Sequence, residues 1–161
     1  MYKEIIVCIL VVILIFSMDL LSNNYTKKVF FSIDGDLGKL FKDMLDNGYI
    51  DFCTRENKVN FSITNYLVCE AVPVVTGNYK GNYNDVLTTT HEMGHSYQKY
   101  LAGIEDKKYI VSPLLKYPTF EIAEMFSYAL QLIATDYVDP LFSDDDKKKY
   151  GFLCIYNLIT M

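Results

Sequence analysis

The pentapeptide His-Glu-Met-Gly-His, residues 91–95, constrains this chain more than any other stretch, because it contains both histidines of the sequence. In an α-helix, residues four apart lie on one face, so the rings of His91 and His95 would point toward a common position. Neutral imidazole nitrogens bind zinc, and a catalytic zinc keeps one coordination position for water. Glu92 would lie beside that water and could take its proton. The pattern predicts a zinc site on a helix, and the alternative is a solvated helix with two surface histidines.

The residues around the pentapeptide favour the helix that such a site requires. Mostly apolar side chains recur there at helical spacing, at Val86, Thr90, Met93, Tyr97 and Leu101. We expect a helix over residues 84–102, with Asn84 or Asp85 as its N-cap and Gly103 just after its end. Gly94 inside this helix costs roughly 1 kcal/mol relative to alanine. This cost indicates that another segment packs closely at Gly94, although a surface glycine without a role is also possible.

A third ligand would have to be a carboxylate or a cysteine, because no further histidine is present. Residues 119–137 predict a long amphipathic helix after Pro118, with Thr119 as a possible cap. The face expected to lie in the core is apolar and consists of Ile122, Met125, Phe126, Ala129, Leu130 and Ile133. A second stripe is polar and consists of Glu121, Glu124, Tyr128 and Gln131. Taken alone, the polar stripe would face water, but beside a His-Glu-Met-Gly-His helix one of its glutamates is the better candidate ligand.

Residues 73–98, PVVTGNYKGNYNDVLTTTHEMGHSYQ, resemble the catalytic segment of the M3 family of zinc metallopeptidases, and in particular its oligoendopeptidase F branch. The resemblance includes an Asn-aromatic-x-Gly turn at residues 78–81, the Asn-Asp-Val that follows, and the HExGH helix. Residues 120–127, FEIAEMFS, are similar to the family's second-helix signature, Ala-Glu-x-x-Ser after an aromatic residue. With a weaker likeness at residues 37–51, the resemblance covers about residues 36–161.

The resemblance implies one zinc ion held by His91, His95 and Glu124, with Glu92 as the general base. It leaves Glu121, one turn before Glu124, without a role. The implied function is that of a zinc metalloendopeptidase, which hydrolyses peptide bonds of oligopeptides. In the family, the strand before the motif helix is an edge strand that pairs with the substrate backbone. That role would fall here to residues 72–77, with Val74, Val75, Thr76 and Gly77 as the substrate-binding residues.

The chain also departs from the family pattern. Gln131 stands where the family usually has a glutamate that orients a zinc histidine, and it would be a weaker, neutral partner. Tyr128, from the same polar stripe, is the other residue expected beside the ligands. The tyrosine and histidine that stabilise the oxyanion in the family, and its long N-terminal helical lobe, have no counterpart in the sequence. An alternative function is therefore a truncated, catalytically weak or inactive zinc-binding remnant of such a peptidase.

The N-terminal residues 1–22 are expected to be a hydrophobic anchor or signal-like segment, followed by a partial M3-type catalytic domain over residues 23–161. Residues 5–16, IIVCILVVILIF, are apolar without a break. This run is shorter than the roughly 20 residues that span a bilayer, and no Ala-x-Ala-like cleavage site follows it. We expect a helix over residues 5–21 that anchors the chain to a membrane. The alternative is a cytoplasmic protein, as in the family, in which a missing lobe would cover this helix.

Composition argues against nucleic acid as a partner, because the net charge is −5 and no basic stripe is present. The four cysteines, Cys8, Cys53, Cys69 and Cys154, have no metal-binding spacing. We expect reduced, buried thiols, although Cys53 and Cys69 could pair in an exported domain. The sequence does not indicate an oligomeric state.

These patterns together predict a mainly α fold: a zincin-type helical catalytic core with a small β-sheet beside the HExxH helix, incomplete relative to the family. Further helices are expected over residues 36–47 and 147–160, and strands within residues 59–76. The run DDDKKK, residues 144–149, predicts the solvated start of the last helix, with its acidic residues near the N-terminus.

Overall fold

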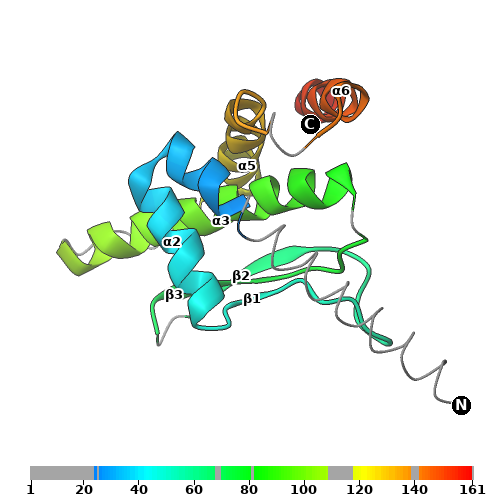
Figure 1. The fold of residues 1–161 in the computed structure, drawn as a ribbon. Coiled ribbons are helices and arrows are strands. Elements are labelled where there is room, and N and C mark those ends of the chain that lie inside the picture. Colours follow the sequence, from blue (N-terminus) through cyan, green and yellow to red (C-terminus); the bar gives the residue numbers. More distant parts are fainter. Residues whose placement is uncertain are drawn as a thin grey trace, which may run out of the picture.

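The structure, a computed structural model, describes residues 24, 26–67, 70–80, 82–108, 118–138 and 142–160. The chain is mainly helical and has one small sheet. Its helices and strands are α2 (Gly35–Asp46), β1 (Ile50–Asp51), β2 (Ile63–Leu67), β3 (Val72–Thr76), α3 (Tyr83–Lys108), α5 (Phe120–Ala134) and α6 (Asp144–Thr160). Residues 26–33 are also helical and precede α2. Figure 1 shows the long helix α3 between the sheet on one side and α5 and α6 on the other. The predicted fold class is confirmed.

Helix α3 begins before the predicted N-cap residues and extends beyond the predicted end. Asn82 Oδ1 accepts a hydrogen bond from the Asn84 N–H at 2.9 Å, and Asp85 Oδ2 accepts one from the Asn82 N–H at 2.9 Å. This reciprocal capping starts the helix at Tyr83. Gly103 lies inside the helix, and a Cβ there would come within 2.5 Å of the Tyr66 hydroxyl. The glycine therefore allows close packing against β2 and does not terminate the helix.

Helix α6 begins three residues earlier than predicted. The acidic residues Asp144, Asp145 and Asp146 form its first turn, as the sequence indicated. Ser143 Oγ accepts a hydrogen bond from the Asp146 N–H at 3.3 Å and donates one to the Asp146 carboxylate at 2.7 Å. Negative charge at a helix N-terminus is favourable, so the cap and the acidic turn together set this boundary.

The sheet has the strand order β1-β3-β2, with β1 parallel and β2 antiparallel to β3. The prediction that residues 72–77 form an edge strand is therefore wrong, because β3 is the central strand. The short strand β1 was not predicted as a strand. It pairs Ile50 with Val75 and Asp51 with Thr76, and so occupies one side of β3. In the part of the chain that is described, no strand pairs with the outer side of β2.

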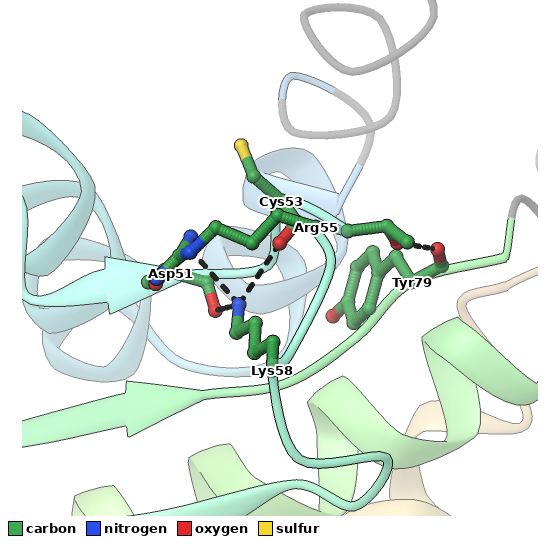
Figure 2. A network of polar contacts seen from close by, with 6 residues as sticks. Asp51, Cys53, Arg55, Lys58 and Tyr79 are labelled. Carbon is green, nitrogen blue, oxygen red and sulfur yellow. Dashed lines mark hydrogen bonds and ion pairs between the residues drawn. The ribbon is translucent and has the colours of Figure 1, made fainter.

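The loop that leaves β1 is held by a network of polar contacts (Figure 2). Lys58 Nζ donates to the backbone carbonyls of Asp51 and Cys53 at 2.9 and 3.0 Å, and lies 3.0 Å from an Asp51 carboxylate oxygen. Arg55 binds the same carboxylate through two nitrogens. The Thr54 hydroxyl donates to the Tyr79 carbonyl. These contacts fix the loop against the segment that enters α3.

The cysteines agree only in part with the prediction of buried thiols. Cys154 is buried, but Cys53 is an exposed thiol in the loop after β1, so the prediction is wrong for Cys53. The Cys53 backbone carbonyl takes part in the Lys58 network, and the thiol points away from it (Figure 2). Cys8 and Cys69 lie outside the described residues.

Two hydrophobic clusters hold α3 in place. The first consists of Phe30, Leu37, Leu40, Phe41, Met44, Val75, Met93 and Leu130, and it joins the N-terminal helices, the sheet, α3 and α5. The second consists of Val29, Leu87, Ala134, Val138, Tyr150 and Cys154, and it joins α3, α5 and α6. Within the second cluster, the Tyr150 hydroxyl lies 3.0 Å from Thr90 Oγ1 and 3.3 Å from the Gln131 carbonyl oxygen. Helix α6 is thus tied to both α3 and α5.

The predicted core face of α5 is wrong, because its polar side packs inward. Among the six apolar residues expected in the core, only Leu130 is buried. The buried residues of this helix are Glu124, Ser127, Leu130, Gln131 and Ala134. The opposite side exposes Phe120, Ile122, Met125, Phe126 and Ile133. The polar side faces α3 because α3 approaches α5 at Gly94.

The contact at Gly94 is very close. A Cβ on Gly94 would lie 2.4 Å from the Ser127 Cα and 2.9 Å from the Phe126 carbonyl oxygen. Both atoms belong to the α5 backbone, so no side-chain movement could make room. The prediction that another segment packs closely at Gly94 is confirmed.

In the described part of the chain, no helix has both the length and the hydrophobicity to cross a membrane. The expected anchor, residues 1–22, and its helix over residues 5–21 lie outside the described residues.

We expect Gly94→Ala to destabilise the fold by at least about 1–3 kcal/mol, the usual cost of an overpacked site, because the new methyl group would force two helix backbones apart. Gly151→Ala in α6 is the matched control. Its nearest neighbour would be Thr135 Cγ2 at 3.8 Å, so we expect a gain of roughly 0.5–1 kcal/mol from helix propensity. Urea unfolding followed by circular dichroism measures both. Equal midpoints for wild type and Gly94→Ala would contradict the packing described here.

We expect Asp51→Asn to reduce the loss of stability in acid. The hydrogen bond from Arg55, and then Lys58, lower the pKa of Asp51 from 3.8 to about 2. The charged carboxylate therefore stabilises the folded state above pH 4, and this contribution is lost as the pH falls toward 2. Because the carboxylate is 36% exposed, solvent screening keeps the effect small. Urea midpoints at pH 6 and pH 3 should differ less in the variant, and an unchanged difference would contradict the assignment.

Candidate metal and catalytic site

The structure brings His91, His95 and Glu124 together at the junction of α3 and α5. His91 Nε2 lies 3.2 Å from one Glu124 carboxylate oxygen, and His95 Nε2 lies 3.3 Å from the other. One donor atom from each of the three side chains falls within 4.8 Å of the others. The close contact between Gly94 and Ser127 lies within one turn of all three residues. The packing of the helices therefore sets the geometry of the cluster.

The three side chains are close enough to share one metal ion. The nitrogen-to-oxygen distances of 3.2 and 3.3 Å run to different oxygens of the Glu124 carboxylate, Oε2 from His91 and Oε1 from His95. One donor atom from each side chain lies within 4.8 Å of the other two, and zinc bonds of about 2.0–2.1 Å would draw these atoms to roughly 3.3 Å apart. Two imidazoles and one carboxylate also form a donor set that suits zinc. The residues present therefore fit the metal that the sequence predicted.

Burial of the three candidate ligands favours the binding of a cation. The side chains of His91, His95 and Glu124 are 20%, 14% and 10% exposed. Burial, followed by the charges of His91 and Lys99, lowers the pKa of His95 to about 4. His95 is therefore neutral at pH 7, as a metal ligand must be. Glu121, the other glutamate of the polar stripe, is exposed at the start of α5.

Glu92 is buried against β2, with 6% of its surface exposed. Thr64 Oγ1 lies 2.6 Å from Glu92 Oε2 and 3.0 Å from the Glu92 backbone oxygen. Burial raises the pKa of Glu92, while the hydrogen bond from Thr64 and the charges of His91 and Lys99 oppose the rise. A carboxylate with a raised pKa and one fixed oxygen is well suited to accept a proton.

Two residues of the site, Thr64 and Lys99, were missed in the sequence. Lys99 Nζ donates a hydrogen bond to the Thr64 carbonyl oxygen at 3.2 Å. Burial lowers the pKa of Lys99, and the charges of Glu92 and Glu124 oppose this shift. Lys99 lies seven residues after Glu92, a spacing that places both on one face of a helix. That spacing was the available signal for Lys99, whereas no local pattern identifies Thr64.

Tyr128 and Gln131 both reach α3 from α5. The rings of Tyr128 and His91 meet edge to face, with centroids 5.2 Å apart. Gln131 Nε2 donates to the Leu87 carbonyl at 2.9 Å, one turn before His91. Gln131 Oε1 is buried and has no hydrogen-bond partner among the residues described. The Gln131 side chain thus ends beside α3, and its described bond goes to the Leu87 backbone instead of a histidine ring.

The predicted substrate-binding residues Val74, Val75, Thr76 and Gly77 lie in or directly after the central strand. The N–H groups of Val75 and Gly77 donate to the carbonyls of Tyr49 and Asp51, both at 2.9 Å, on the β1 side. Val74 and Thr76 are opposite Asn65 and Ile63 of β2. Both sides of β3 are therefore occupied by neighbouring chain, and these backbone groups are not available to a peptide.

The outer edge of β2 is the edge that remains in the described sheet. Thr64 is opposite Val75 and Tyr66 is opposite Pro73. Val75 directs its N–H toward β1, and proline has no N–H, so neither pair forms bonds between β2 and β3. The backbone N–H and C=O groups of Thr64 and Tyr66 therefore point away from β3. This edge lies directly beside Glu92, because Thr64 contacts the Glu92 side chain.

Comparisons with known proteins agree with this geometry. The sequence profile of peptidase family M3 matches residues 16–151. No curated protein sequence matches the chain. Similar solved structures include a protein described as an oligoendopeptidase F (23% identity), one of the same description from Bacillus anthracis (25%) and PZ peptidase A with an inhibitor (24%).

Each of these structures has a TM-score of 0.70 and covers 81% of this chain. The chain in turn spans only 22–23% of the length of these three proteins. The structural likeness shows that the fold is shared. The sequence match extends over most of the chain, and the chain therefore belongs to peptidase family M3.

Proposed function

We propose that this chain is a zinc metalloendopeptidase that hydrolyses peptide bonds of oligopeptides. The observation that carries the proposal is the cluster of His91, His95 and Glu124, with Glu92 next to it in sequence and buried against β2. Family membership supports peptide-bond hydrolysis, and the descriptions of the similar structures as oligoendopeptidases support oligopeptides as the substrate class.

The side chains of the cluster have distinct roles in this proposal. His91 and His95, through Nε2, and Glu124, through its carboxylate, would hold the metal. The chemistry that zinc would supply there is Lewis acidity toward the scissile carbonyl and a water molecule. Thr64 fixes Glu92 Oε2, so the other carboxylate oxygen is left to take the proton of the attacking water. Glu92 then delivers this proton to the leaving amine.

The outer edge of β2 supports the binding of an extended peptide. An added strand forms main-chain hydrogen bonds with the edge that it joins. The outward N–H of Thr64 offers such a bond, and the Thr64 carbonyl, which accepts one hydrogen bond from Lys99 Nζ, has a second lone pair. Because Thr64 also contacts Glu92, a peptide on this edge would lie beside the proposed base. In this proposal, β2 takes the substrate-pairing role expected of residues 72–77.

We expect the full chain to bind one zinc ion, and His91→Ala or His95→Ala to abolish binding. Glu124→Ala should weaken binding by more than the 10–100-fold typical of residues that only support a ligand, because it removes a direct ligand. Glu121→Ala is the matched control and should bind normally, since Glu121 is exposed on the same helix. Metal analysis after dialysis against a zinc buffer measures all four variants. Normal zinc content in either histidine variant would refute the proposed site.

We expect the zinc-loaded chain to cleave an internally quenched fluorescent peptide, and Glu92→Gln to reduce kcat by a factor of about 10²–10⁴. The variant should keep its zinc, because Glu92 is a base in the proposal and not a ligand. Zinc content measured on the same sample separates the two effects. If wild type and Glu92→Gln are equally inactive while both hold zinc, the chain is a zinc-binding protein without peptidase activity.

A further inference from the structure

Lys99 is a cation held at the outer edge of the sheet. Its Nζ donates to the Thr64 carbonyl oxygen at 3.2 Å. The register of β2 and β3 directs this carbonyl away from β3, toward the edge that no described strand occupies. The ammonium group of Lys99 therefore lies within hydrogen-bonding distance of the edge that a peptide strand added to β2 would join.

This cation has donors that the described structure does not use. An ammonium group has three N–H donors, and the described bond to Thr64 uses one of them. Among the described residues, no carboxylate lies within 4.0 Å of Lys99 Nζ. Glu92 and Glu124 act on Lys99 only through their charges at longer range. A metal ion bound to Glu124 would offset the negative charge of Glu124. The positive charge of Lys99 would then be compensated less than it is without the metal.

The position of Lys99 at the edge of β2 determines which groups of a bound peptide it would contact. In a strand, side chains project above and below the sheet, and only backbone groups lie along the edge. Along this edge, a backbone carbonyl or the terminal α-carboxylate of the peptide could therefore reach Lys99 beside the Thr64 carbonyl. The carboxylate is the stronger partner, because hydrogen bonds between two charged groups are roughly twice as strong as neutral ones. Partial burial of Lys99 strengthens this preference further.

We propose that Lys99 binds the C-terminal α-carboxylate of a peptide that has joined the outer edge of β2. The preferred ligands are then short peptides with a free C-terminus, and amidated peptides are discriminated against. Thr64 contacts both Lys99 and Glu92, so the bound C-terminus would lie close to the proposed base. The consequence for cleavage rests on the proposed peptidase function: the bond that is cut should lie near the C-terminus. The binding itself does not require cleavage.

The test compares two probes that differ only at the C-terminus: fluorescein-labelled tetra-alanine as the free acid and as the amide. Fluorescence anisotropy measures their dissociation constants for the zinc-loaded full chain carrying Glu92→Gln, which prevents cleavage. We expect the acid to bind about 10-fold more tightly than the amide, as a charged hydrogen bond would give. Equal binding of the two probes, or binding of neither, would overturn the proposal without any further variant.

Substitutions at Lys99 assign the preference to this residue. Lys99→Met should weaken the acid about 10-fold and leave the amide unchanged, while Lys99→Arg should keep most of the preference. Lys148→Met, an exposed lysine of α6 on the far side of α3 from the sheet, is the control and should change neither probe. A preference that persists in Lys99→Met would show that Lys99 only ties α3 to β2. Zinc content and peptide cleavage, measured separately, report on the proposed peptidase function.

Discussion

The contact of Gly94 with the backbone of Ser127 is the constraint on which the site depends. It brings two helices so close that a single methyl group would separate them. Gly94 lies between the two histidines, and Ser127 lies one turn after Glu124. The donors from α3 and α5 can meet only because the helices meet at this point. A motif that is usually described by its ligands is thus equally a motif for close helix packing.

Most features that depend on a single helix could be predicted from the sequence. The spacing of His91 and His95 sets their geometry in any helix, and the likeness of residues 120–127 to a family signature singled out Glu124. Glu124 lies beside both histidines, as expected. The positions of α2, α3, α5 and α6 were predicted, but not all of their ends: α3 extends six residues beyond its predicted end, and α5 ends three residues before its own.

Features that depend on how the strands and helices pack against one another could not be predicted. Alternation of side chains indicates strands but carries no information about their order, so the central position of β3 and the short β1 were missed. The orientation of α5 was missed for a different reason. Apolar residues are usually buried, but here the polar side of the helix carries Glu124 and meets the glycine of α3. Thr64 and Lys99 belong to the site only because β2 lies against α3.

The inverted orientation of α5 has a consequence for how this helix is held. Among the described residues, α5 contributes Leu130 and Ala134 to the two buried clusters, and Leu132 packs, partly buried, against the second. Burial of apolar surface produces most of the heat-capacity change on unfolding. Detachment of α5 would therefore contribute little to that change. A metal ion that binds Glu124 together with the α3 histidines stabilises only the docked arrangement. Metal binding would then stabilise the packing of α5 against α3, as the burial of a hydrophobic face does for most helices.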